Sequence, residues 1–209
     1  MDFFSILVAK KIGYCRDWIS ALFAKKFPDL PVGYQRLAGI QMDASTYYAI
    51  TDFKLTGGDT LRFAFSANRA CNVLGCYTTT TASTNYSLYA TTTAGGKYLR
   101  YDGGTYNSVV DTGERYDVVI TPTGSNGMKN DETWTAKDFT AVSDLLIGST
   151  SVGATSAKLD GAMYGNIEVD GKLKLIPCKR ISDNAIGYYD AYSKTFYEPV
   201  GDAPTPITI

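Results

Sequence analysis

The chain has 209 residues, of which 44% are hydrophobic and 20% are charged, a composition typical of a globular protein. Its formal net charge is −1, so we expect no nucleic-acid partner, because general nucleic-acid binding requires clustered lysine and arginine. It contains no histidine, which excludes a Ser-His-Asp triad, a Cys-His dyad and the commonest transition-metal sites.

The first segment, residues 1–29, is predicted to hold a short amphipathic helix that ends before Pro28 and Pro31. A helix this short must bury its apolar stripe against its own domain, against further copies or on a larger particle; a membrane surface is a third, weaker alternative. Lys10 and Lys11 interrupt the apolar run, so we expect neither a secretory signal nor a membrane span. The residues predicted to anchor or oligomerise are Phe3, Phe4, Leu7, Val8, Trp18, Ile19, Leu22 and Phe23.

From Gly33 onward, short alternating or apolar runs between glycine-rich turns predict many strands, and therefore a β-sandwich or barrel. Asp170-Gly171 is the expected turn of a tight hairpin over residues 167–174. Residues 201–209 are predicted to form a loosely held C-terminal extension. The predicted strands are residues 46–50, 60–66, 86–89, 97–101, 116–121, 144–148 and 165–169.

Both ends of the β region carry specific motifs. The first is Leu30-Pro-Val-Gly-Tyr-Gln-Arg-Leu-Ala-Gly-Ile40, and the second is Ile176-Pro-Cys-Lys-Arg-Ile-Ser-Asp-Asn-Ala-Ile-Gly-Tyr-Tyr-Asp-Ala-Tyr-Ser-Lys-Thr-Phe-Tyr197, the closing block. These segments resemble the opening and the end of concanavalin A-like (laminin-G-like) jelly-roll domains, which are common in bacteriophage and prophage virion proteins. The resemblance spans roughly residues 30 to 200, and only its two ends are motif-specific.

This resemblance implies an all-β fold, a concanavalin A-like jelly-roll β-sandwich over residues 30–200, preceded by the N-terminal helix. It further implies a non-enzymatic virion protein, made in the bacterial cytoplasm, that acts as a head fibre, capsid decoration or tail-appendage module. The implied partners are other capsid or tail proteins, further copies of the chain (frequently as a trimer) and a host-surface glycan. Aromatic rings beside amides suit sugar binding, and the predicted residues are Tyr86, Tyr98, Tyr101, Tyr106 and Asn107.

Two other functions compete with this interpretation. The first is a glycoside hydrolase or lyase on the same fold, for which Glu168 and Asp170 are the nearest match to a catalytic acid pattern. Lys172 and Leu173 occupy the positions where a third acid would fall, so no catalytic residue is predicted. The second is a bacterial cell-surface adhesion module, which should carry a signal peptide or wall anchor.

No metal or cofactor is predicted. Calcium could be held by loop oxygen atoms, but the candidates form no recognisable ligand string. These candidates are Asp102, Asn107, Asp183, Asn184 and Asp190. Cys71 and Cys76 are expected to be buried free thiols, with a bridge across a turn as the alternative.

Overall fold

The computed structural model describes residues 30–76, 86–92, 97–102, 104–150 and 157–209, and gives only the backbone of Lys97, Tyr98 and Arg100. The predicted N-terminal helix and its eight anchoring residues lie outside this part of the chain. The part that is described consists of strands and loops, with no helix long and apolar enough to cross a membrane. Residues Gly33–Ile209 form one compact unit.

Most of the strands are short, as the closely spaced turn residues predict. They are β1 (Tyr34–Arg36), β2 (Gly39–Asp43), β3 (Tyr48–Ile50), β4 (Leu61–Ala67), β5 (Cys71–Cys76), β6 (Tyr86–Ala90), β7 (Lys97–Tyr101), β8 (Gly104–Asn107), β9 (Tyr116–Thr121), β10 (Gly124–Asn126), β11 (Glu132–Thr133), β12 (Leu145–Ile147), β13 (Asp160–Val169), β14 (Leu173–Arg180), β15 (Ile186–Asp190), β16 (Phe196–Tyr197) and β17 (Thr205–Ile207).

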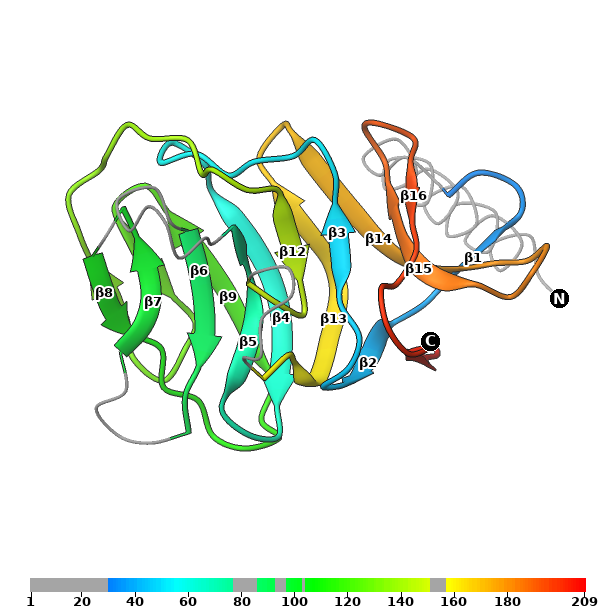
Figure 1. Cartoon of the computed structure of the whole chain (residues 1–209), viewed down its shortest axis with the longest axis horizontal. Coiled ribbons are helices and arrows are strands. Elements are labelled where there is room, and N and C mark those ends of the chain that lie inside the picture. Colours follow the sequence, from blue (N-terminus) through cyan, green and yellow to red (C-terminus); the bar gives the residue numbers. More distant parts are fainter. Residues whose placement is uncertain (1–29, 77–85, 93–96, 103, 151–156) are drawn as a thin grey trace, which may run out of the picture. The chain divides into compact units, whose positions relative to one another are not determined.

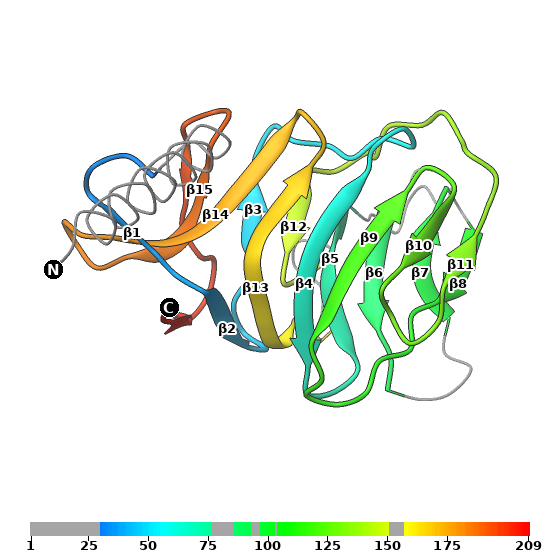
Figure 2. The same cartoon turned by 180° about the vertical axis from the view of Figure 1, so that it is seen from behind.

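These strands form two sheets whose ladders are all antiparallel within the described residues. The large sheet runs β11-β10-β9-β4-β13-β14-β15-β16, with β2 also paired to β13, β17 to β2 and β1 to β14. The small sheet runs β3-β12-β5-β6-β7-β8. The small sheet is nearer the viewer in Figure 1, and the large sheet is nearer in the opposite view of Figure 2. The arrangement is therefore sandwich-like, as the sequence predicts.

The core lies between the sheets because successive side chains of a strand point to opposite faces. In β4, Leu61, Phe63 and Phe65 belong to the core, whereas Arg62 is exposed on the outer face. Across the sandwich, Tyr48 of β3 packs edge-on against Tyr188 of β15, with ring centroids 4.9 Å apart. This contact joins an edge strand of the small sheet to the large sheet.

The predicted hairpin is confirmed, and the predicted tail is not. Val169 pairs with Leu173, and Gly171 occupies the turn with a φ of +67°, a conformation that favours glycine. By contrast, Thr205–Ile207 forms β17, which pairs with β2. The prediction of a loose extension over residues 201–209 is therefore wrong for this strand, because its backbone completes the edge of β2.

Candidate functional site

The strongest candidate for a binding site is a groove of about 330 Å³ on the outer face of the large sheet. It lies over β9, β4 and β13, three neighbouring strands that Figure 2 shows side by side. This volume falls at the low end of the range for small-molecule sites, about 300–1,000 Å³. The long polar side chains that line it are Arg62, Arg115, Asp117, Tyr164, Asn166 and Glu168.

The groove forms because small residues lie among long ones. Ala64 of β4 stands between Tyr164 of β13 and Asp117 of β9, so its methyl group leaves a hollow. β13 also carries a bulge, in which Phe63 alone stands opposite residues 165–167 and Gly165 has a φ of +60°. A bulge bends its strand and re-aims nearby side chains. We refer to this hollow as the bulge groove.

Three ion pairs border the bulge groove, so that three cations face three carboxylates. They are Arg62–Asp170, Arg115–Asp117 (2.8 Å between Nη2 and Oδ1) and Lys174–Glu168 (3.1 Å between Nζ and Oε1). The site therefore combines many hydrogen-bonding groups with balanced charge.

An aromatic ring and an amide complete the site. The Tyr164 hydroxyl lies 3.2 Å from the Ser66 hydroxyl, and the Arg115 guanidinium lies over the Tyr164 ring, 5.1 Å from its centroid. Asn166 Nδ2 donates to Glu168 Oε1 at 3.3 Å. These contacts hold the ring, the amide and the carboxylate in place before any ligand arrives.

The two carboxylates that resemble a catalytic pair have separate basic partners. Glu168 belongs to β13 and contacts Lys174, whereas Asp170 lies in the turn after the strand and contacts Arg62. A retaining glycosidase needs its two carboxyl groups to face each other across the scissile bond. Glu168 and Asp170 therefore each belong to one of the three ion pairs that border the groove.

The tyrosines predicted to bind glycans fall into different environments. Tyr86 is fully buried in the core, and Tyr101 is also buried, with its hydroxyl donating to the Gly57 carbonyl oxygen at 2.6 Å. Burial raises the pKa of both phenols above the ordinary value. The prediction that these two rings face a sugar is therefore wrong, because their strands turn them toward the core. The Tyr98 side chain lies outside the described part.

Tyr106 and Asn107 lie half-exposed in β8, at the edge of the small sheet. Asn107 Nδ2 donates to Glu132 Oε1 at 2.7 Å, and the centroids of the Tyr106 and Trp134 rings lie 4.7 Å apart. Because Glu132 belongs to β11, this contact connects the edge strands of the two sheets. Nothing in the local sequence around Glu132 indicates its partner in β8.

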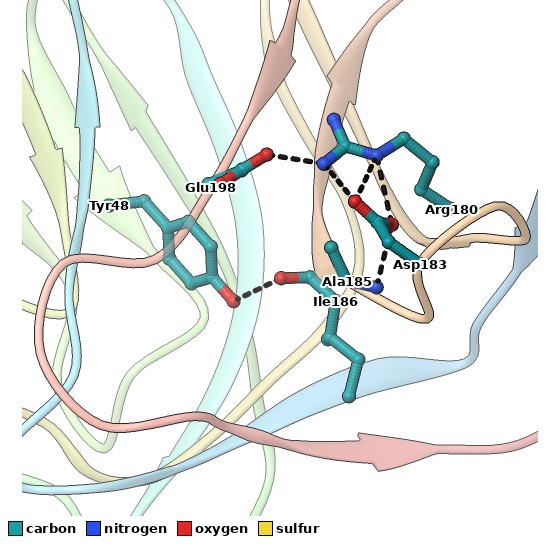
Figure 3. Close-up of polar contacts among 6 residues, drawn as sticks. All are labelled: Tyr48, Arg180, Asp183, Ala185, Ile186 and Glu198. Carbon is teal, nitrogen blue, oxygen red and sulfur yellow. Dashed lines mark hydrogen bonds and ion pairs between the residues drawn. The ribbon is translucent and has the colours of Figure 1, made fainter.

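The closing block forms β14, β15 and β16 and holds itself together by polar contacts, drawn in Figure 3. Arg180 Nε donates to both carboxylate oxygens of Asp183, at 3.0 and 3.1 Å, and its Nη2 lies 2.5 Å from Glu198 Oε1. The Arg180 guanidinium also lies 4.7 Å from the centroid of the Phe196 ring. Arg180 therefore binds the β14–β15 turn to the segment that follows β16.

A second acid of the closing block, Asp190, fixes the next turn. Its carboxylate accepts hydrogen bonds from the backbone N–H groups of Lys174, Tyr192 and Ser193, at 3.0, 3.1 and 2.9 Å. Burial opposes the charged form, but a hydrogen bond from the Ser193 side chain and these backbone hydrogen bonds prevail, and the pKa of Asp190 is lowered. The carboxylates of Asp183 and Asp190 thus stabilise the turns of the closing block.

Replacement of Asp183 by asparagine should reduce stability only above acidic pH. Its hydrogen bonds with Arg180 lower the pKa of Asp183 from 3.8 to about 2. A lowered folded-state pKa stabilises the native state above the unfolded pKa, and this contribution disappears as the pH falls toward 2. Thermal unfolding of both proteins between about pH 2 and pH 7 should show a deficit for Asp183→Asn that vanishes at the acid end.

The matched control for Asp183 is Glu114→Gln, since Glu114 is exposed and makes no ion pair within the described residues. Its melting temperature should track that of the parent at every pH. A deficit of Asp183→Asn that persisted unchanged to pH 2 would contradict the assignment.

The calcium candidates are dispersed among separate contacts. Asp102 lies 3.3 Å from Lys137 Nζ, whereas Asp183 and Asp190 belong to two different turns of the closing block. Asn184 has a φ of +62° in the first of these turns. Within the described ranges, the acidic and cysteine side chains form no group of three that could hold a metal ion.

Cys71, Cys76 and Cys178 are free and buried, which confirms the prediction for the first two. Cys71 and Cys76 occupy the two ends of β5, and a rise of about 3.3 Å per residue separates them by roughly 16 Å, too far for a disulfide. Burial raises the pKa of Cys76 and Cys178 to about 12, and it also raises the pKa of Cys71. These thiols therefore remain protonated at neutral pH and act as core residues.

A second hollow, of about 340 Å³, lies on the outer face of the small sheet. It is bordered by Ala49 of β3 and Leu146 of β12, which are paired across the two strands, and by Lys54 and Asp144. It has fewer polar side chains than the bulge groove and no aromatic ring, so substitutions in it are suitable controls for the groove.

Comparison of the chain with protein-family models, curated proteins and solved structures finds no match.

Proposed function

We propose that the chain is a non-enzymatic bacteriophage virion protein, a head-fibre, capsid-decoration or tail-appendage module. Its segment 1–29 anchors it to capsid or tail proteins and to further copies of itself, with a trimer as the expected assembly. Its sandwich is a concanavalin A-like jelly roll that faces host-surface glycans. The protein is made in the bacterial cytoplasm and resides in the virion.

The observation that carries this proposal is the set of polar contacts that hold the closing block together. Arg180, Asp183 and Asp190, which the family resemblance singles out, all make contacts that hold β14, β15 and the following turns together. A motif with this structural role is consistent with membership of a fold family. The antiparallel pairing and the two-sheet arrangement further support a jelly roll.

An attachment role fits the outer surface better than hydrolysis does. The bulge groove contains donors and acceptors in balance, and Glu168 and Asp170 are each engaged with a base. Binding without turnover needs only such a rigid polar surface, whereas hydrolysis needs two carboxyl groups facing the scissile bond.

Deletion of residues 1–27 should abolish association with particles while the sandwich still folds. The reason is that the apolar anchoring stripe is removed, whereas Gly33–Ile209 forms a compact unit with its own core. The measurements are co-sedimentation with purified virions that lack the protein, and light scattering of the free chain. The full chain with Lys25→Ala and Lys26→Ala is the control, since it keeps the apolar stripe. A truncated chain that still joins particles and multimers would overturn the anchoring role.

A further inference from the structure

The bulge groove holds the features of a saccharide site, and the ligand class follows from its charges. The three cations of the ion pairs that border it are all engaged with carboxylates at the same surface. An anionic ligand would have to compete with Asp117, Asp170 and Glu168 for these cations. A cationic ligand would meet the same competition in reverse. The balance therefore favours a ligand without net charge.

Hydroxyl groups match the remaining hydrogen-bonding capacity of the groove. Each hydroxyl of a sugar both donates and accepts, and the guanidinium, amide and carboxylate groups offer both kinds of partner. Arg62 and Arg115 have five N–H donors each, only some of which their carboxylate partners can occupy. Asn166 and Glu168, already aligned by their mutual hydrogen bond, present an amide and a carboxylate side by side.

Tyr164 adds an apolar surface beside these polar groups. Its hydroxyl is tethered to Ser66, and the Arg115 guanidinium lies over its half-buried ring, so the ring is held in one position next to the hollow over Ala64. Sugars carry C–H groups that pack on such rings while their hydroxyls bond to neighbouring polar groups. The volume of about 330 Å³ limits the bound part to a small unit of a larger glycan.

From these features we infer that the bulge groove binds an uncharged saccharide unit of a glycan, with Tyr164 as the packing surface and Asn166, Glu168, Arg62 and Arg115 as hydrogen-bonding partners. This inference rests on the proposed glycan-facing role of the sandwich and moves it from the predicted tyrosines of β6–β8 to the outer face of the large sheet.

The test is a glycan array with the full chain, followed by titration calorimetry of the best binder. We expect the binders to be uncharged glycans, with affinities that change by less than about twofold between about 0.05 M and 0.5 M NaCl, because salt screens only interactions between charges. Binders that are all sulfated, phosphorylated or carboxylated, with affinity falling steeply in salt, would overturn the inference. So would an array without any binder.

Ala64→Leu and Asn166→Ala locate the site, and Ala49→Leu is their control. Ala64→Leu fills the hollow and should abolish binding, whereas Ala49→Leu, on the outer face of the small sheet, should bind like the parent. Asn166→Ala leaves the hollow open and should weaken binding by roughly tenfold through the loss of one hydrogen bond. The Asn166 variant also covers the case in which Ala64→Leu fails to fold. Unchanged affinity in a folded Ala64→Leu or Asn166→Ala protein would place the sugar elsewhere.

The same proteins separate this inference from the proposed function. Ala64→Leu should still join particles through residues 1–29, because the groove lies on the sandwich. Loss of sugar binding with intact particle association supports both proposals. Particle association without sugar binding by the parent chain refutes both the groove and the glycan-facing role of the sandwich, and leaves the virion role standing. Sugar binding without particle association refutes only the virion role.

Discussion

The variant Gly57→Ala should lose about 3 kcal/mol of stability, a melting temperature lower by roughly 10 °C. A Cβ atom at this position would clash with the Lys137 carbonyl oxygen and would lie only 2.8 Å from Phe139 Cδ1. Gly57 also donates its N–H to the Phe139 carbonyl oxygen at 2.9 Å and accepts a hydrogen bond from Tyr101. The added methyl group would therefore push the segment around Gly57 away from residues 137–139, to which it is hydrogen-bonded. Thermal and denaturant unfolding measure the resulting loss of stability.

The neighbouring glycine supplies the control. Gly58 is exposed, and the nearest atom to an added Cβ is Thr56 Oγ1 at 3.9 Å. Gly58→Ala should therefore leave the melting temperature unchanged or raise it slightly, because alanine restricts the unfolded chain. Equal melting temperatures for the two variants would show that the close approach at Gly57 is not a stability determinant.

Tyr86 should respond differently to two substitutions. Tyr86→Ala removes a fully buried ring and should cost about 4 kcal/mol. Tyr86→Phe keeps the ring and removes a buried hydroxyl that has no hydrogen-bond partner within the described part of the chain, so stability should be retained or rise by about 1 kcal/mol. Denaturant unfolding monitored by tryptophan fluorescence gives both values.

The phenylalanine variant also tests the role of Tyr86. Because the ring is enclosed in the core, Tyr86→Phe should bind any glycan ligand with unchanged affinity. Tyr188→Phe is a parallel case, since its buried hydroxyl likewise lacks a partner among the described residues. A loss of about 1 kcal/mol or more on Tyr86→Phe would mean that the hydroxyl makes a favourable contact in solution.

Local sequence signals account for much of the fold. The alternating pattern of residues 116–121 gave the bounds of β9, and Asp170-Gly171 gave the turn between β13 and β14. Strand β5 was not predicted, because all of its residues are buried and it shows no alternation. The pairing of β4 with β13 was also beyond local reasoning, since a register between residues about one hundred positions apart depends on the whole sheet.

The candidate site was harder to predict for the same reason. Period-two alternation places Tyr86 and Leu88 on one face of β6, but not whether that face points to the core or to solvent. The bulge groove combines Ala64, Asp117 and Tyr164 from three separate strands. Its one local signal was Gly165, which marks a break within an otherwise regular strand.

The pairing of β17 with β2 and of β13 with β4 has a consequence for how the protein folds. Such distant partners impose a high contact order, and chains of this kind fold slowly because long loops must close before their contacts form. During synthesis β2 and β4 emerge well before the strands that complete them, and their backbone edges remain open to other nascent chains until then. Folding of this domain is therefore expected to be largely post-translational, with a window in which chaperones protect the early strands.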